Sequence, residues 1–254
     1  MLEHWIIWVW YATPVLQAML LGKLLHARIA AKYPWFFAWM CLGLLQSLVL
    51  ITVASQPKVY QLAWIATLAL AGVLEVGVAR EVFSLRSRQY GGVSAFGRGL
   101  LAVIIVIAIA LALFAVRAEL RAPGLARIVK TTTILKRTLD SSLGLFLVTA
   151  GAVFLFFHET PVSRNVLRHF RILAAYFTAV AAGFLVGNLT GRGGYTWVNL
   201  WFGLVSAVCY TLWTLAFSTQ GETAAKLSPA TPEERARLAR LDAQLSELLS
   251  SVKF

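Results

Sequence analysis

The chain has 254 residues, of which 59% are hydrophobic and only 13% are charged. A water-soluble domain carries roughly a quarter charged residues, so the composition excludes that class and indicates a membrane protein. The formal net charge of +12 would suit nucleic acid, but the basic residues are spread through loops beside apolar segments. We therefore expect anionic lipid headgroups, and no nucleic acid, as partners.

Seven apolar segments are long enough to cross about 30 Å of hydrocarbon as helices. They cover residues 5–23, 34–54, 59–79, 99–116, 134–157, 170–190 and 196–217. Their uninterrupted apolar runs exclude a membrane barrel and predict an all-α polytopic fold. We expect a transmembrane domain over 1–218, a polar linker over 219–230 and a cytoplasmic amphipathic helix over 231–254.

The distribution of basic residues predicts an amino terminus outside and a carboxyl terminus inside. In that orientation, 15 of the 23 Lys and Arg residues lie on the inner side. Six of the other eight lie between residues 117 and 137, which opposes the rule. The start "MLEH" has no positive charge to hold it inside, and it lacks the basic beginning of a cleaved signal peptide. We expect the first span to be retained.

One acid, Glu75, interrupts the apolar run "LAGVLEVGVAR" at 70–80. Ala71, Gly72 and Ala79 share its helix face, so Glu75 is expected to point at another helix. Arg80 follows about one turn later, which predicts a position near the cytoplasmic boundary. Expected cations for this acid are Lys23, Arg164, Arg168 and His169. An ionisable residue in a span is a functional-site candidate, and a structural ion pair is the alternative.

Other polar residues in the predicted spans could form a small intramembrane pocket together with Glu75. Gln46 lies in the second span, while Asn199, Ser206 and Tyr210 lie at helical spacing along the seventh. Hydrogen bonding between helices is the alternative role for such side chains. The pocket and the interhelical role both place these residues inside the bundle.

Residue size predicts where two spans lie. Small residues at intervals of four let helix backbones approach closely in lipid, so a sixth span with such a stripe is expected in the middle of the bundle. The stripe consists of Ala175, Ala179, Gly183 and Gly187. The fourth span is branched and apolar on all sides, so we expect it at the periphery.

Three cations surround the predicted start of the fifth span: Lys130, Lys136 and Arg137. Free backbone amides and the helix dipole favour anions at such a start. The cations therefore form a candidate site for an anionic ligand or for lipid phosphates of the outer leaflet. Asp140, three to four residues later, offsets part of their repulsion.

The final 24 residues predict an amphipathic helix. Thr231, Pro232 and Glu234 supply an N-cap, a first-turn proline and a capping box. A two-heptad apolar seam follows, formed by Leu238, Leu241, Leu245, Leu248 and Val252. The seam could bind a cytoplasmic partner or a second copy, dock on the protein's own loops, or lie on the inner leaflet.

The sequence shows no recognisable catalytic pattern, so we expect no catalytic residue, metal or cofactor. None of the four histidines lies in a predicted span. His158, Glu159 and His169 share one connection, but solvated loop residues are the expected interpretation rather than a metal site. No nucleophile elbow or phosphate-binding loop is present, and the seventh span has no lysine for a Schiff base.

The order of "KYPWFFAWM" at 32–40, a third span ending in "AREVF" at 79–83, a basic loop and a short-looped final pair resembles a group of uncharacterised seven-helix bacterial proteins. More loosely, it resembles the seven-helix input domains of bacterial sensor kinases, although no kinase or cyclase sequence follows the seventh span. The resemblance implies a multi-pass protein of the bacterial cytoplasmic membrane with a sensing or scaffolding role and output through the tail. It carries over no catalytic residue. A small-solute transporter or channel using Glu75 and the seventh span is the second hypothesis, and an intramembrane enzyme is the third.

Overall fold

The structure is a computed structural model that describes residues 2–87, 91–117, 124–156, 162–190 and 195–222, together with tail residues 236, 239–240, 242–244 and 247. The described residues form no strand, which confirms the all-α prediction. The elements are α1 (Leu2–His26), η1 (Ala30–Lys32), α2 (Pro34–Thr52), α3 (Pro57–Ser87), α4 (Gly91–Arg117), α5 (Gly124–Phe156), α6 (Arg164–Thr190), α7 (Tyr195–Ala216) and η3 (Gln220–Glu222).

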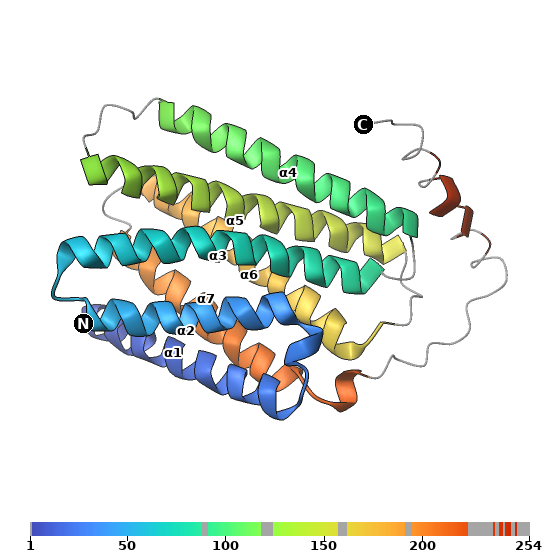
Figure 1. Cartoon of the computed structure of the whole chain (residues 1–254), viewed down its shortest axis with the longest axis horizontal. Helices are drawn as coiled ribbons and strands as arrows, with labels where there is room; N and C mark the ends of the chain where they lie inside the picture. Colours follow the sequence, from blue (N-terminus) through green and yellow to red (C-terminus); the bar gives the residue numbers. More distant parts are fainter. Residues whose placement is uncertain are drawn as a thin grey trace.

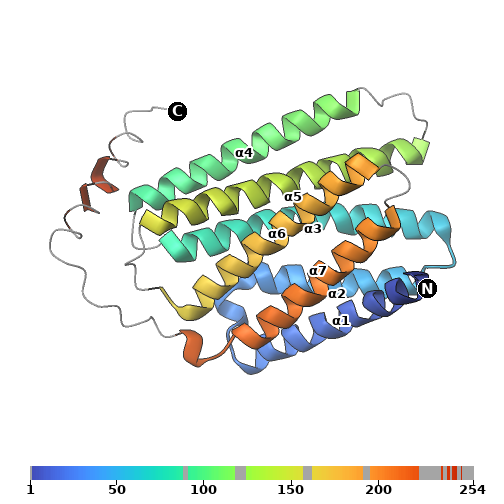
Figure 2. The same ribbon diagram turned by 180° about the vertical axis from the view of Figure 1, so that it is seen from behind.

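Six of these helices form a closed ring in which each contacts the next, in the order α1, α2, α3, α5, α6, α7 and back to α1. α4 lies outside the ring against α3 and α5, as Figures 1 and 2 show from opposite sides. The expectation of a peripheral fourth span is thus confirmed. Its outward side chains, including Val103, Val106 and Ile107, are exposed, which suits a helix with no polar group to bury.

Four of the described helices are long and apolar enough to cross a membrane: α2, α3, Arg164–Gly187 of α6 and Thr196–Ala216 of α7. The described apolar part of α4, Ser94–Ala110, is shorter. Large Leu, Val, Ile and Trp side chains are exposed on the outward faces of the bundle. Apolar surface on this scale is unusual for a protein in water and normal for one in lipid.

Several helices extend well beyond their predicted spans, α3 and α5 among them. α3 continues to Ser87, because Val82 and Phe83 are buried and pack as the apolar face of a helix whose other face is polar. α5 begins at Gly124 rather than near 134. Hydropathy marks the apolar part of a helix, whereas the backbone hydrogen-bond ladder continues into polar sequence wherever neighbouring helices support it. These helices are therefore longer than the apolar spans that they contain, and the span bounds themselves stay predictions.

The buried core fills one end of the ring, the end at which α1, α3, α5 and α7 finish. We call this the core end, and the opposite end, where these helices begin, the open end. α3 contacts α6 across the ring in addition to its ring neighbours. The largest fully buried side chains of the core end include Tyr33, Phe36, Phe146, Phe177, Trp213 and Phe217. Packed aromatic side chains thus fill the core end.

Part of the small-residue stripe of α6 lies against α7. A Cβ on Gly183 would lie 2.6 Å from atoms of both Trp201 and Phe202, and one on Gly187 would lie 3.3 Å from Val198. Trp201 Nε1 donates to the carbonyl of Ala179 at 2.8 Å. Ala175, by contrast, is exposed. α6 contacts α3, α5 and α7, but it is one of the six ring helices and exposes Leu185 and Val186, so the expected place in the middle of the bundle is not found.

Candidate functional site

The open end of the ring contains three adjoining cavities. An inner chamber of about 240 Å³ includes Thr13, Ser47, Leu68 and Lys136 in its wall. An outer chamber of about 440 Å³ shares these four residues. A side chamber of about 670 Å³ lies between α1, α2 and α3. Shared wall residues make the three chambers neighbours, with the inner chamber closest to the packed core.

All five residues predicted for an intramembrane polar site line these chambers. Glu75 and Tyr210 line the inner chamber, Gln46 lines the inner and side chambers, and Asn199 and Ser206 line the outer chamber. Their gathering depends on the ring, because the residues come from α2, α3 and α7. Residues on these helices can approach one another only where the ring brings the polar faces together.

The inner chamber ends at a buried ion cluster. Lys136 Nζ lies 2.9 Å from Glu75 Oε2 and 2.5 and 2.6 Å from the two carboxylate oxygens of Asp140. Glu75 and Asp140 are each 3% exposed. Two carboxylates therefore share one ammonium in the buried interior of the bundle. Such a cluster is costly unless its charges are balanced.

The cation of Glu75 differs from the sequence expectation. It is Lys136 of α5 rather than Lys23, Arg164, Arg168 or His169. Lys23 instead donates to the carbonyl of Thr214, and Arg168 donates to that of Ala216 at 2.9 Å. Glu75 also lies about three turns before the end of α3. Arg80 does not end the helix, and the expected position of Glu75 near the cytoplasmic boundary of the membrane stays a prediction.

The face of Glu75 was predicted correctly. Ala71, Gly72 and Ala79 are buried with it, and a Cβ on Gly72 would lie 3.1 Å from Leu139 of α5. Small residues on α3 therefore let α5 approach closely enough for Lys136 to reach Glu75.

The basic cluster of the fifth span does not lie at a helix start. Lys136 and Arg137 are about three turns inside α5, where the backbone amides already bond to preceding carbonyls. Lys130 is exposed on the same helix. Arg137 lines the outer chamber, and its guanidinium lies 5.1 Å from the centre of the Phe184 ring. The geometry expected for an anion at free helix amides is absent here.

Further polar side chains, which sequence reasoning did not assign to the site, line the inner chamber or belong to the ion cluster. Gln17 lines the chamber, and its Nε2 donates to Tyr210 Oη at 3.1 Å. Tyr176 lines the same wall. Asp140 completes the ion cluster by accepting from Lys136 Nζ. The four-residue spacing of Lys136 and Asp140 was the available signal for their pairing, and Gln17 was visible as a polar residue in an apolar run.

His169 is a buried residue of α6 and not a solvated loop residue. It is fully buried, and its ring packs against Tyr33, Phe36, Trp213 and Phe217 at centroid distances of 5.5, 4.4, 5.8 and 5.5 Å. The loop prediction failed because α6 begins at Arg164, one and a half turns earlier than the apolar span. His158 and Glu159 lie outside the described residues. Within the described part of the chain, no three His, Cys, Asp or Glu side chains gather as metal ligands would.

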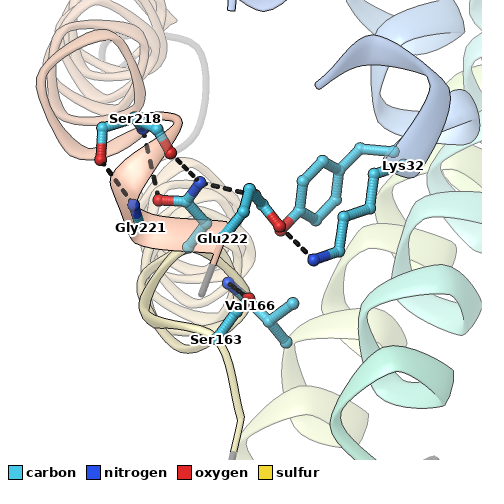
Figure 3. A network of polar contacts seen from close by, with 8 residues as sticks. Lys32, Ser163, Val166, Ser218, Gly221 and Glu222 are labelled. Carbon is cyan, nitrogen blue, oxygen red and sulfur yellow. Dashed lines mark hydrogen bonds and ion pairs between the residues drawn. The ribbon is translucent and has the colours of Figure 1, made fainter. Parts of the chain in front are cut away.

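A polar network at the core end fixes the residues that precede the tail (Figure 3). The carboxylate of Glu222 accepts from Lys32 Nζ, from Tyr33 Oη at 3.0 Å and from Asn165 Nδ2 at 2.5 Å. Asn165 also donates to the Ser218 carbonyl at 2.7 Å. Burial, and then the charge of Glu222, raises the pKa of Tyr33 well above its ordinary value. Tyr33 therefore remains a neutral donor. We call these residues the Glu222 network.

The Glu222 network also shortens the predicted linker. Residues 220–222 form η3 and pack on α6 instead of belonging to a free linker from 219 onward. The described tail residues are helical. The proposed seam residues Leu238, Leu241, Leu245, Leu248 and Val252 lie outside the described residues.

Comparison of the chain with protein-family models, curated proteins and solved structures finds no match. The geometry of the site is therefore the basis for assigning a function.

Proposed function

We propose that this chain is a sensor-like, non-enzymatic membrane protein that binds a small ligand in the chambers of its open end. In this proposal the chain crosses a bacterial cytoplasmic membrane seven times, with the amino terminus outside and the tail inside. The observation that carries the proposal is the position of the chambers. They lie at the open end and stop at the ion cluster. Beyond the ion cluster, packed aromatic side chains fill the interior of the helix ring.

The charge distribution supports this orientation. Basic side chains at the core end include Lys23, Arg28, Lys32, Arg80, Arg86, Arg98, Arg164, Arg168 and Arg171. Positively charged loops stay in the cytoplasm and can contact anionic lipid headgroups. The core end is then cytoplasmic, and the chambers face outward.

A continuous series of ring contacts connects the inner chamber with the base of the tail, which favours sensing over transport. Tyr210 stacks on Trp213 at 6.2 Å, Trp213 contacts Phe36 at 4.9 Å, and Phe36 contacts His169 at 4.4 Å. His169 in turn contacts Tyr33, which donates to Glu222. Packed rings have discrete arrangements, so a shift at the chamber can move the Glu222 network.

Hydrogen exchange can test this connection without a known ligand. Ala71→Leu adds bulk to the inner chamber wall and should change amide exchange at residues 218–222 by about fivefold or more, a coupling of common size. When Trp213→Leu is already present, adding Ala71→Leu should cause no further change in the amide exchange at residues 218–222. Equal exchange in the wild type and Ala71→Leu would contradict the proposed connection.

The tail helix is the proposed output, through a cytoplasmic partner or a second copy. Leu241→Asp combined with Leu245→Asp would place two charges in the apolar seam, and it should abolish a dimer or a captured partner. Ala236→Asp introduces the same side chain outside the seam and serves as a matched control. Assembly unchanged by the double substitution would contradict this role.

Transport of a small solute is the second candidate, because the ion cluster adjoins the chambers inside the ring. Transport requires the site to open alternately to both faces. With Cys41 and Cys209 replaced by Ala, a cysteine at Ser47 would report access to the chambers. The sensing proposal expects labelling by an impermeant reagent from outside alone, whereas labelling from both faces would favour transport.

A further inference from the structure

We propose that the inner chamber binds the ammonium group of a small protonated amine. This inference rests on the proposed function and names the chemical class of its ligand. It follows from the charges and the hydrogen-bonding groups of the chamber wall.

The ion cluster lacks one positive charge when all its members are ionised. Glu75 and Asp140 contribute two negative charges and Lys136 contributes one positive charge. Among the described residues, Lys136 is the one cation in the inner chamber wall. Arg137 lines the outer chamber, where its guanidinium lies over Phe184. A buried excess of negative charge is unfavourable, so the cluster will take up a proton or a cation.

Lys136 is poorly placed to bind an anion. Its Nζ donates to both carboxylate oxygens of Asp140 and lies 2.9 Å from Glu75 Oε2. An anion beside Lys136 would therefore adjoin two buried carboxylates, which repel it. Glu75 Oε2 is buried and, apart from this ion pair, has no hydrogen-bond partner among the described residues, so it can accept a hydrogen bond from a ligand that donates one.

Three of the remaining polar groups in the wall offer acceptors. Thr13 Oγ1 donates to the Val9 carbonyl at 2.8 Å, and Ser47 Oγ donates to the Gly43 carbonyl at 3.0 Å. Each hydroxyl proton is thus used within its own helix, and the oxygen lone pairs remain. Gln17 is 3% exposed, and its Oε1 has no hydrogen-bond partner among the described residues. A ligand that donates several hydrogen bonds fits this wall.

Aromatic rings complete the chamber. Trp39, Tyr176 and Tyr210 line it, and ring faces attract organic cations. The outer chamber adds Trp10, Trp64 and Phe202, which can contact the apolar part of the same ligand. The inner chamber of about 240 Å³ admits an ammonium group and a short stem, and it leaves a larger ligand body in the outer chamber.

Binding of 2-phenylethylammonium to the purified full chain in lipid nanodiscs tests the inference. Calorimetry at constant ionic strength should detect its binding, and neither 3-phenylpropionate nor 2-phenylethanol should bind comparably. Glu75→Gln should weaken amine binding by about 10- to 100-fold, the usual effect of losing a charged hydrogen-bond partner. Glu81→Gln is the matched control, since Glu81 lies on the same helix but bonds to the amides of Trp35 and Phe36 instead.

A second variant keeps the test decisive if Glu75→Gln fails to fold. Ala71→Leu narrows the inner chamber beside Glu75 without changing a charge, and it should also weaken amine binding about tenfold or more while the protein elutes as the wild type does. Amine binding of unchanged affinity in Ala71→Leu would overturn the inference. So would binding of sodium in place of the amine, or uptake of a proton alone with no amine binding.

The failure of this inference and that of the proposed function are separable. Absence of amine binding, with exchange at 218–222 still responding to Ala71→Leu, would remove the ligand class and leave sensing intact. Amine binding with no response at 218–222 would leave the ligand class and remove the connection to the tail.

Discussion

Lys136 Nζ lies 2.9 Å from Glu75 Oε2, so a cation on α5 is paired with an acid on α3 inside the ring. The same ammonium contacts both carboxylate oxygens of Asp140 one turn along α5. One lysine therefore connects two helices and balances part of the charge of two buried acids. Because Lys136 contacts both acids, its removal should lower the stability of the protein more than removal of either acid.

Lys136→Met should destabilise the protein strongly, because it leaves two buried carboxylates without a cation. Removing one partner of a buried pair costs about 3–5 kcal/mol, whereas replacing the whole group by neutral residues is often nearly neutral. The triple variant with Glu75→Gln, Asp140→Asn and Lys136→Met should therefore recover most of the loss. Thermal unfolding in detergent measures both, and equal stability of the single and triple variants would count against the cluster.

Gly77→Ala should be destabilising, because a Cβ at this position would lie 2.1 Å from Trp35 Cε3. Trp35 is 43% exposed, so displacing its ring should cost about 1 kcal/mol, the lower end of the range for overpacking. Gly22→Ala is the matched control, since nothing lies within 4 Å of its added Cβ. That control should be neutral or should stabilise the helix by up to about 1 kcal/mol. Unfolding curves for the two variants should therefore move in different directions or by clearly different amounts.

Glu81 caps α2 from a neighbouring helix. Its carboxylate accepts from the backbone amides of Trp35 at 2.9 Å and Phe36 at 3.3 Å, at a helix start whose own N-cap, Tyr33, supplies no side-chain bond. Glu81→Ala should cost about 0.5–2 kcal/mol, as loss of a cap does. Glu81→Gln retains an acceptor oxygen and should cost less. A larger loss for Gln than for Ala in thermal unfolding would contradict the capping role.

The Glu222 network should hold residues 218–222 on the bundle. Glu222→Ala removes the acceptor for Lys32, Tyr33 and Asn165, and amide exchange at these residues should rise by about tenfold or more for the loss of charged hydrogen bonds. Thr219→Ala changes an exposed side chain in the same segment and should leave the exchange unchanged. Comparable protection in Glu222→Ala and the wild type would show that other contacts hold this segment.

The amino-acid sequence by itself determined the fold class, the peripheral place of α4 and the inward face of Glu75. These follow from local periodicity and residue size, because an apolar run must form a helix in lipid and small residues must mark close helix contacts. The tertiary structure alone decided which cation meets Glu75 and that Gln17 joins the pair of Lys136 and Asp140 at one site. Those relationships join residues far apart in the chain, and hydropathy carries no information about the register between helices. The tertiary structure also placed His169 in the core and the base of the tail on the bundle. Both follow because helices extend beyond their apolar segments wherever packing supports them.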